Sequence, residues 1–182
     1  TALPIFRMVR LASDARVAGM LSGKCGMITL HMGSDDRTLS LVEQALETTS
    51  IPIKIFHPTH VTRSRKLLGE AFDFAKQGGF IDMTCGSKGE SAPSLCVMRA
   101  KEQGVPLQNI TFSSDGMGSW STYDEAGNLL RIGYSAVDTV YQEIKRLVQE
   151  YKMPLEEALC FGTSNTARAL EIERKKGHIA PG

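Results

Sequence analysis

Three side chains of the kinds that bind divalent metal ions lie at equivalent points of the sequence, each after a short apolar segment. They are His31 in LHMGSDD, His60 in PTHVTR and Asp115 in SSDGMGS. Neutral imidazoles can hold Zn(II) while leaving positions open for water. A carboxylate that faces such a water can take its proton and deliver it to a leaving amine. Arg63, which follows His60 closely, offers a fixed fork for a substrate carboxylate.

Each of these residues also has an ordinary structural interpretation. A single histidine at a strand end is more often a hydrogen-bonded structural residue, and an aspartate before glycine usually caps its own backbone in a turn. Arg63 is equally compatible with a surface position on the following helix. The recurrence of two histidines and an aspartate at the same place in successive segments favours a site. We interpret His57 as a packing or supporting residue, because Pro58 prevents HPTH from forming one helical face.

A repeat of strand followed by helix is the framework that must position these side chains. The predicted strands and the helices that follow them are 27–30 with 38–46, 51–56 with 67–75, 79–83 with 92–100, and 110–112 with 136–148. Further helices are predicted over 5–21, 155–161 and 163–170. Helices between successive short buried strands indicate parallel pairing with right-handed crossovers.

Two architectures are built from this repeat: an open doubly wound sheet and a closed (β/α)8 barrel. An open sheet would normally carry a glycine-rich turn after its first strand, and HMGSDDR matches neither GxGxxG nor the P-loop pattern. A barrel needs about 250 residues and builds its site at the carboxyl ends of its strands. Four units in 182 residues therefore predict an α/β fold that is half of a (β/α)8 TIM barrel. The start at Thr1 and the turn-like tail GHIAPG also suggest a piece of a longer chain.

The overall composition is that of a soluble globular protein. Lys plus Arg number 21 against 20 Asp plus Glu, and no basic stripe indicates a nucleic-acid partner. No apolar run approaches the roughly 20 residues of a membrane span, and the sequence does not open with a signal peptide. Cys25, Cys85, Cys96 and Cys160 are scattered without a CxxC pair, as is typical of reduced thiols. These features favour a cytoplasmic protein without membrane or nucleic-acid partners.

The motifs HMG, PTHVTR, SSDGMGS and TSNTARAL…GHIAPG, taken together, resemble isoaspartyl dipeptidase of the amidohydrolase superfamily along essentially the whole chain. GGFIDMT and the DEAGNL loop (124–129) also fit. The resemblance implies a binuclear metal centre, usually zinc although another divalent metal is possible, with His31, His60 and Asp115 as ligands. It further implies that Arg63 and Ser119 hold the carboxylates of a β-aspartyl dipeptide. The implied reaction is hydrolysis by a metal-bound hydroxide, with Asp115 as the proton shuttle.

Parts of the family pattern are absent from the 182 residues. There is no HxH pair and no strand-end lysine that could bridge two metals, since Lys24 lies one unit too late. The chain resembles strands five to eight of a metal-dependent hydrolase barrel, so residues 1–182 form a partial barrel domain without the N-terminal half or the family's small β-sandwich. We expect these residues alone to be inactive. The resemblance implies as partners the remaining half of its own barrel or another chain, and a homo-oligomer.

Two other functions remain open at this stage. One is another amidohydrolase activity, of the dihydroorotase or N-acyl amino acid hydrolase type. The other is a non-catalytic structural descendant of the fold, although such a protein has no physical need for the polar set described above. Sequence upstream of Thr1 would discriminate, because HxH and a strand-end lysine support the enzyme.

Overall fold

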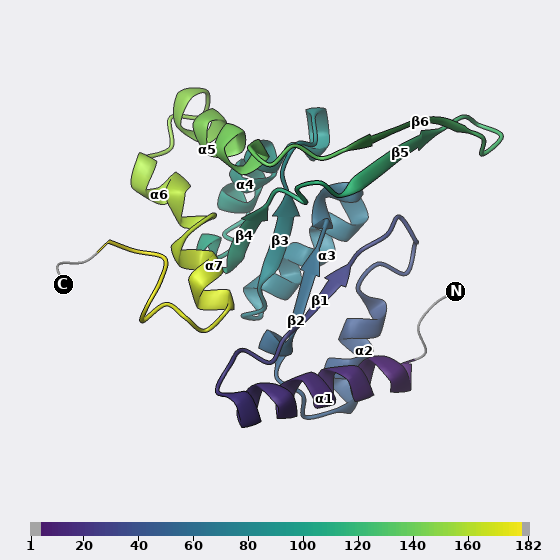
Figure 1. Ribbon diagram of the computed structural model, residues 1–182, viewed down its shortest axis with the longest axis vertical. Coiled ribbons are helices and arrows are strands. Elements are labelled where there is room, and N and C mark those ends of the chain that lie inside the picture. The colour runs from purple at the N-terminus through teal and green to yellow at the C-terminus, as the bar shows by residue number, and fades with distance from the viewer. Residues whose placement is uncertain (1–4, 180–182) are drawn as a thin grey trace.

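Four parallel strands form the centre of the protein in a computed structural model, which describes residues 5–179 (Figure 1). They are β1 Ile28–His31, β2 Phe56–Thr59, β3 Ile81–Thr84 and β4 Ile110–Ser113. β1 pairs with β2 and β3 with β4, both in parallel, and β2 lies beside β3. The four carboxyl ends therefore share one edge, as the strand–helix repeat predicted.

Helices connect the strands, and α3 and α4 lie behind them in the view of Figure 1. The helices are α1 Ile5–Ser22, α2 Ser40–Thr48, α3 Arg65–Lys76, α4 Pro93–Glu102, α5 Thr139–Gln149, α6 Leu155–Cys160 and α7 Ser164–Ala169. Short 3-10 turns are η1 Ile53–Ile55, η2 Val61–Arg63, η3 Gly89–Ser91 and η4 Leu107–Asn109. No helix within residues 5–179 is long and apolar enough to cross a membrane.

The hydrophobic core lies between the strands and the inner faces of these helices. Leu67, Ala71 and Ala75 are fully buried at helical spacing in α3, which is the stripe that an amphipathic helix packs against a sheet. Phe56 and Ile81 are fully buried in the strands. Apolar burial of this kind fixes the strand positions, and through them the side chains at the carboxyl edge.

The second strand begins later than predicted. Residues 51–56 were expected as a strand, but η1 occupies 53–55 and β2 begins at Phe56. Pro52 starts the turn, and the amide of Ile55 donates to the Pro52 carbonyl at 3.0 Å, so this amide is used in a turn instead of a strand ladder. The HPT motif, which was expected to follow the strand, therefore lies within β2.

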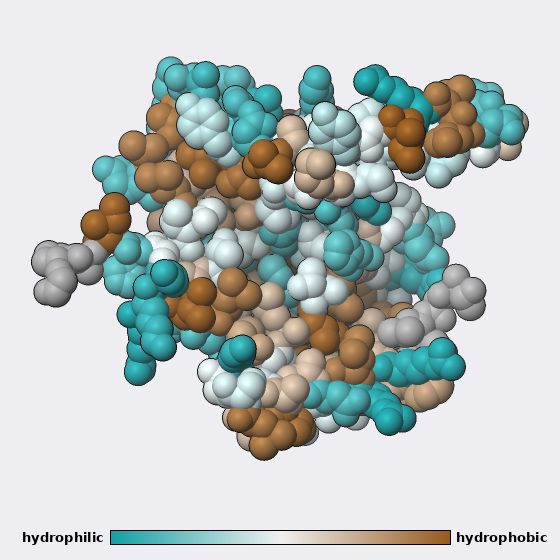
Figure 2. Space-filling view, viewed as in Figure 1, coloured by the Kyte–Doolittle hydropathy of each residue, from teal (hydrophilic) through white to brown (hydrophobic). Residues whose placement is uncertain are grey.

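An antiparallel hairpin is a further element that the sequence did not predict. β5 Ser119–Tyr123 pairs with β6 Leu129–Tyr134, and the predicted loop 124–129 is its turn. The Asp124 carboxylate closes this turn by accepting from the Asn128 backbone amide at 2.7 Å. The hairpin extends away from the body of the protein and exposes apolar side chains (Figure 2). The start at Thr1 and the last three residues of the tail GHIAPG lie outside the described residues.

Candidate active site

Two histidines from neighbouring strand ends face each other at the carboxyl edge. His31 is the last residue of β1, and His60 follows β2 directly. The Nδ1 atom of His31 lies 3.1 Å from the Nε2 atom of His60. The parallel register explains this meeting, because His31 is paired with Thr59, the residue before His60. His31 is exposed, whereas His60 is only 7% exposed.

His60 is held in a backbone conformation that few non-glycine residues adopt. Its φ is 62°, in the left-handed region, where histidine is among the more tolerated residues. The turn is closed by the Arg63 amide, which donates to the His60 carbonyl at 3.2 Å. Ser64 then caps α3 by accepting from the Leu67 amide. Left-handed non-glycine residues cost about 1–3 kcal/mol and cluster at functional sites, which favours a functional role for His60.

Asp115 lies at the same mouth, just after β4. It also has a positive φ, of 48°, and its carbonyl accepts from the Gly118 amide at 2.8 Å. A Cβ atom at position 118 would lie 2.8 Å from the Asp115 carboxylate, so only glycine fits there. Asp115, His31 and His60 line one cavity of about 330 Å³. The DGMG sequence thus forms a tight turn that places Asp115 in the cavity lined by the two histidines.

A second cavity, of about 440 Å³, adjoins the first and contains Arg63. His60 and Asp115 line both cavities and therefore stand at their junction. Ser119, at the start of β5, is exposed and does not line either cavity. Trp120, the next residue, lines the second one.

Trp120 is fixed over the hairpin by two neighbours on the opposite strand. A Cβ at Gly133 would lie 2.3 Å from the indole ring, so the absence of a side chain at that position makes room for the indole. The Arg131 guanidinium lies 5.2 Å from the centre of the indole, within the range of a cation–π contact. The hairpin therefore presents a positioned aromatic wall to the cavity that contains Arg63.

A buried carboxylate on β3, which sequence reasoning missed, organises the interior below the two histidines. Asp82 is 4% exposed and accepts hydrogen bonds from Thr59 at 2.6 Å, Thr111 at 2.9 Å and Ser113 at 2.6 Å. The signal for it was a single charged residue among the mostly apolar residues of the segment FIDMT. A buried carboxylate must be satisfied by donors, and here three hydroxyls satisfy it.

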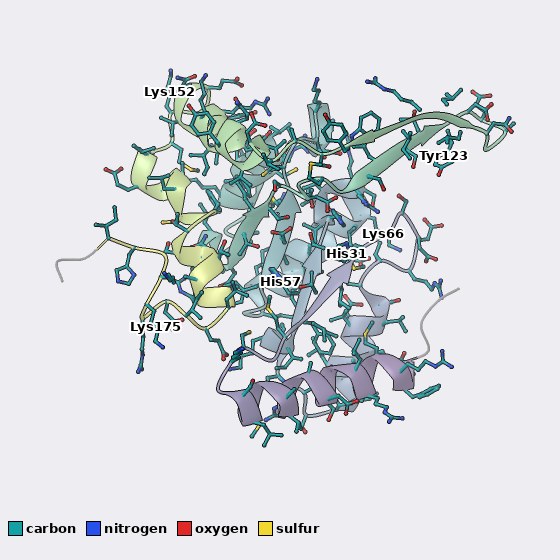
Figure 3. All side chains as sticks on the ribbon, viewed as in Figure 1. His31, His57, Lys66, Tyr123, Lys152 and Lys175 are labelled. Atoms are coloured by element: carbon teal, nitrogen blue, oxygen red, sulfur yellow. The ribbon has the colours of Figure 1, made fainter. Side chains whose placement is uncertain are left out.

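His57 points into this interior network and supports the interpretation of a packing or supporting residue. It is 8% exposed, and its Nε2 atom lies 3.2 Å from the Thr111 hydroxyl. Its Nδ1 atom is buried without a hydrogen-bond partner among residues 5–179. His57 and His31 are labelled on the neighbouring strands β2 and β1 in Figure 3.

The electrostatic environment favours neutral imidazoles. Burial, and next the Arg63 guanidinium, lowers the pKa of His60, while the Asp115 carboxylate opposes this shift. Burial also lowers the pKa of His57, and Asp82 opposes that shift. Because only a neutral imidazole can bind a metal ion, the direction of the His60 shift is the one that a ligand needs.

The two histidines fit one side of a zinc site. Nitrogens on one tetrahedral zinc lie at 2.0–2.1 Å from it and hence roughly 3.3 Å from each other, close to the 3.1 Å observed. Within residues 5–179, however, no three His, Cys, Asp or Glu side chains are grouped closely enough to hold an ion. Asp115 lines the same cavity as the histidine pair.

Comparison with known proteins decides the family. Residues 27–182 match the sequence profile of the amidohydrolase family. This protein belongs to the amidohydrolase family. Two structures of beta-aspartyl dipeptidase from the thermophilic, keratin-degrading Fervidobacterium islandicum resemble this amidohydrolase. One, in complex with beta-Asp-Leu dipeptide, is 37% identical with a TM-score of 0.92, over 100% of this chain and 48% of its own. The other is 36% identical with a TM-score of 0.85, over 99% of this chain and 45% of its own.

A third structure shares the amidohydrolase fold at lower identity. N-acetylglucosamine-6-phosphate deacetylase from Pasteurella multocida is 18% identical with a TM-score of 0.57, over 100% of this chain and 55% of its own. The chain thus spans about half the length of the structures it matches. The resemblance to isoaspartyl dipeptidase that the motifs indicated is confirmed.

Proposed function

We propose that the complete protein is a metal-dependent isoaspartyl dipeptidase that hydrolyses β-aspartyl dipeptides. The observation that carries the proposal is the 3.1 Å approach of His31 Nδ1 and His60 Nε2 at the junction of two cavities, one of which contains Arg63. An imidazole pair beside a cationic subsite suits a substrate with a carboxylate next to the amide to be cleaved. The beta-aspartyl dipeptidase structures at 36–37% identity support the same substrate class.

His31, His60 and Asp115 would hold the metal, with further ligands from outside these residues. Zinc is the proposed ion, because imidazole nitrogens and carboxylates suit it, and another divalent metal is compatible with the same donors. The family resemblance alone implies a binuclear centre. When bound, such an ion acts as a Lewis acid toward water and toward the amide carbonyl.

Residues of this chain would bind the substrate and transfer the proton. Arg63 would bind a substrate carboxylate through two parallel hydrogen bonds, which places the amide next to Asp115. The Asp115 carboxylate would take a proton from the attacking water while the new C–O bond forms. It would then give that proton to the amine as the C–N bond breaks. For Ser119 as a second substrate contact, the proposal rests on the family resemblance alone, since its side chain is exposed at the start of β5.

We also propose that residues 1–182 are the second half, strands five to eight, of a (β/α)8 barrel domain. The support is the four parallel strands with one shared carboxyl edge, together with a chain length about half that of the matched structures. The first half would come from the remainder of the same barrel or from another chain, and the complete protein would form a homo-oligomer. All four cysteines are free, which supports a reducing compartment such as the cytoplasm.

Other amide substrates are the main alternative. A dihydroorotase or N-acyl amino acid hydrolase would share the histidine pair and Asp115 but would place different demands on the Arg63 cavity. A panel assay separates them: the complete, zinc-loaded protein is given β-Asp-Leu, α-Asp-Leu, dihydroorotate and an N-acetyl amino acid at equal concentrations. We expect cleavage of β-Asp-Leu well above all others. Preferential turnover of dihydroorotate or the N-acetyl amino acid would replace the proposed substrate, and no turnover of any would favour the structural descendant.

A further inference from the structure

A chain of hydrogen bonds connects the buried carboxylate of Asp82 to the histidine pair. The Thr59 hydroxyl donates to Asp82 Oδ2 at 2.6 Å, and the Thr59 and Thr84 hydroxyl oxygens are 3.4 Å apart. The Thr84 hydroxyl lies 2.6 Å from Nδ1 of His60. On the far side of that ring, Nε2 of His60 faces Nδ1 of His31 at 3.1 Å. Three strand ends, those of β1, β2 and β3, are thereby joined.

The charge on Asp82 favours one direction for the hydrogen bonds in this chain, although the contact between Thr59 and Thr84 is long, at 3.4 Å. An ionised carboxylate only accepts, and a hydroxyl has a single hydrogen to donate. The Thr59 hydroxyl donates its one hydrogen to Asp82, so toward Thr84 it can act only as an acceptor. When Thr84 donates its hydrogen to Thr59, its oxygen accepts from Nδ1 of His60, 2.6 Å away. The opposite orientation would leave the two threonine oxygens facing each other without a hydrogen between them.

We propose that Asp82, acting through Thr59 and Thr84, fixes His60 in the tautomer that carries its proton on Nδ1. Thr84 and Asp82 are then positioning residues for the site, not catalytic ones. Their effect is to leave the Nε2 atom of His60 unprotonated, with its lone pair directed at the space between the two rings. In the metal-free protein this lone pair accepts the proton of His31 Nδ1; binding of a metal ion at His31 Nδ1 would require that ring to carry its proton on Nε2 instead.

The surroundings of Asp82 agree with this direction. Three hydroxyls, from Thr59, Thr111 and Ser113, converge on its two oxygens, which is the donor set that an ionised carboxylate requires. Thr111 donates to Asp82, so it accepts from Nε2 of His57, 3.2 Å away. The same carboxylate therefore assigns a tautomer to each of two histidines: Nδ1–H for His60 and Nε2–H for His57. Hydrogen bonds to the second nitrogen of a ligand imidazole commonly set its tautomer and basicity.

The tautomer can be measured without metal. The complete protein, labelled with 15N-histidine and freed of metal, is studied by NMR, and a His60→Gln variant identifies the His60 signals. We expect a protonated Nδ1 and an unprotonated Nε2 in the wild type. Thr84→Val removes the acceptor at nearly constant shape, so the Nδ1–H form should lose its preference, whereas Thr84→Ser restores it. Ser113→Ala is the matched control, because it removes a donor to Asp82 without cutting the chain to His60.

Zinc affinity provides a second readout, which rests on the proposed function. Competition with a chelator should show zinc binding weakened about 10–100-fold in Thr84→Val, largely restored in Thr84→Ser, and retained in Ser113→Ala. Asp82→Asn tests the same chain of hydrogen bonds if Thr84→Val does not fold. The amide can donate to Thr59, which would reverse the donor and acceptor roles along the chain. A wild type with His60 protonated on Nε2 would overturn the inference, as would equal losses in Thr84→Val and Ser113→Ala. A wild type that binds no zinc but shows the Nδ1–H tautomer would overturn the proposed function and leave this inference standing.

Discussion

Nδ1 of His31 and Nε2 of His60 approach to 3.1 Å although 29 residues separate them in the sequence. The parallel register of β1 and β2 brings their strand ends together, and His60 follows β2 in the left-handed backbone conformation. The nitrogens are too close to be independent of each other. At this distance one nitrogen donates a hydrogen bond to the other, and the lowered pKa of the buried His60 ring opposes the charged state in which both nitrogens carry protons.

The histidine pair makes a direct prediction for metal binding. His31→Ala and His60→Ala should each lower the zinc affinity of the complete protein by about 100-fold or more, because losing a ligand costs more than the 10–100-fold of losing a ligand's supporting hydrogen bond. His178→Ala, an exposed histidine in the C-terminal segment, is the control and should leave affinity unchanged. The measurement is zinc content after dialysis against graded chelator. Unaltered zinc affinity in both site variants would remove the pair from the metal site.

Arg63 should be needed for substrate and not for metal. Arg63→Ala loses a charge-assisted contact worth about 1.5–3 kcal/mol, so kcat/KM for β-Asp-Leu should fall roughly 10–100-fold while zinc content stays constant. Arg63→Lys keeps the charge but not the planar fork of the guanidinium, so its kcat/KM should lie between those of the wild type and Arg63→Ala. Steady-state kinetics with metal analysis of each purified variant checks this. If Arg63→Ala matched the wild type on β-Asp-Leu, the second cavity would not be the carboxylate subsite.

Gly118 should be required for the position of Asp115. An added Cβ would lie 2.8 Å from the Asp115 carboxylate, so Gly118→Ala must displace either the turn or the carboxylate. A displacement of about 1 Å can cost on the order of 100-fold in rate. Gly69→Ala, in α3 with open space around the position, is the matched control and should be neutral or stabilising by about 0.5–1 kcal/mol. Assays of kcat and of the thermal midpoint compare the two, and equal kcat values would mean that the turn relaxes without moving Asp115.

The free energy of unfolding of the metal-free protein should fall as the pH is lowered below about 6.5, which is the ordinary pKa of a histidine side chain. Burial lowers the pKa values of both His57 and His60, so below that pH the unfolded chain binds more protons than the folded one. The free energy of unfolding therefore decreases with acidification. His57→Gln should make this dependence shallower, and His178→Gln should not. Urea midpoints at about pH 7.5 and 5.5 measure it, and a pH dependence identical in wild type and His57→Gln would contradict the assignment.

The regular part of the fold was predictable because burial leaves a periodic pattern. The helical spacing of Leu67, Ala71 and Ala75 predicted α3. The strand–helix repeat predicted parallel strands, whose shared carboxyl edge carries His31 and His60. The hairpin β5–β6 was not predictable in this way, because most of its residues are exposed. With neither face buried, no alternation of apolar and polar residues is selected.

The site was only partly predictable for a different reason. His31, His60 and Asp115 each follow a strand, so topology alone brings them to one mouth. Asp82 stands within a strand, and its partners Thr59 and Thr111 are 23 and 29 residues away. Nothing in the one-dimensional pattern shows that three ordinary hydroxyls point at one carboxylate. Trp120 was missed for the same reason, because its place in the second cavity depends on the space left by Gly133.

The turnover of β-Asp-Leu by Asp115→Asn, measured together with bound zinc in the complete protein, tests the central claim most directly. An amide cannot carry the proton from water to the leaving amine, so kcat should fall by at least the roughly 100- to 10,000-fold that general acid–base catalysis contributes. Asp14→Asn, at an exposed position of α1, should keep wild-type turnover. Loss of activity with zinc retained is the predicted result. Near-normal turnover by Asp115→Asn with its full zinc content would contradict the proposed mechanism.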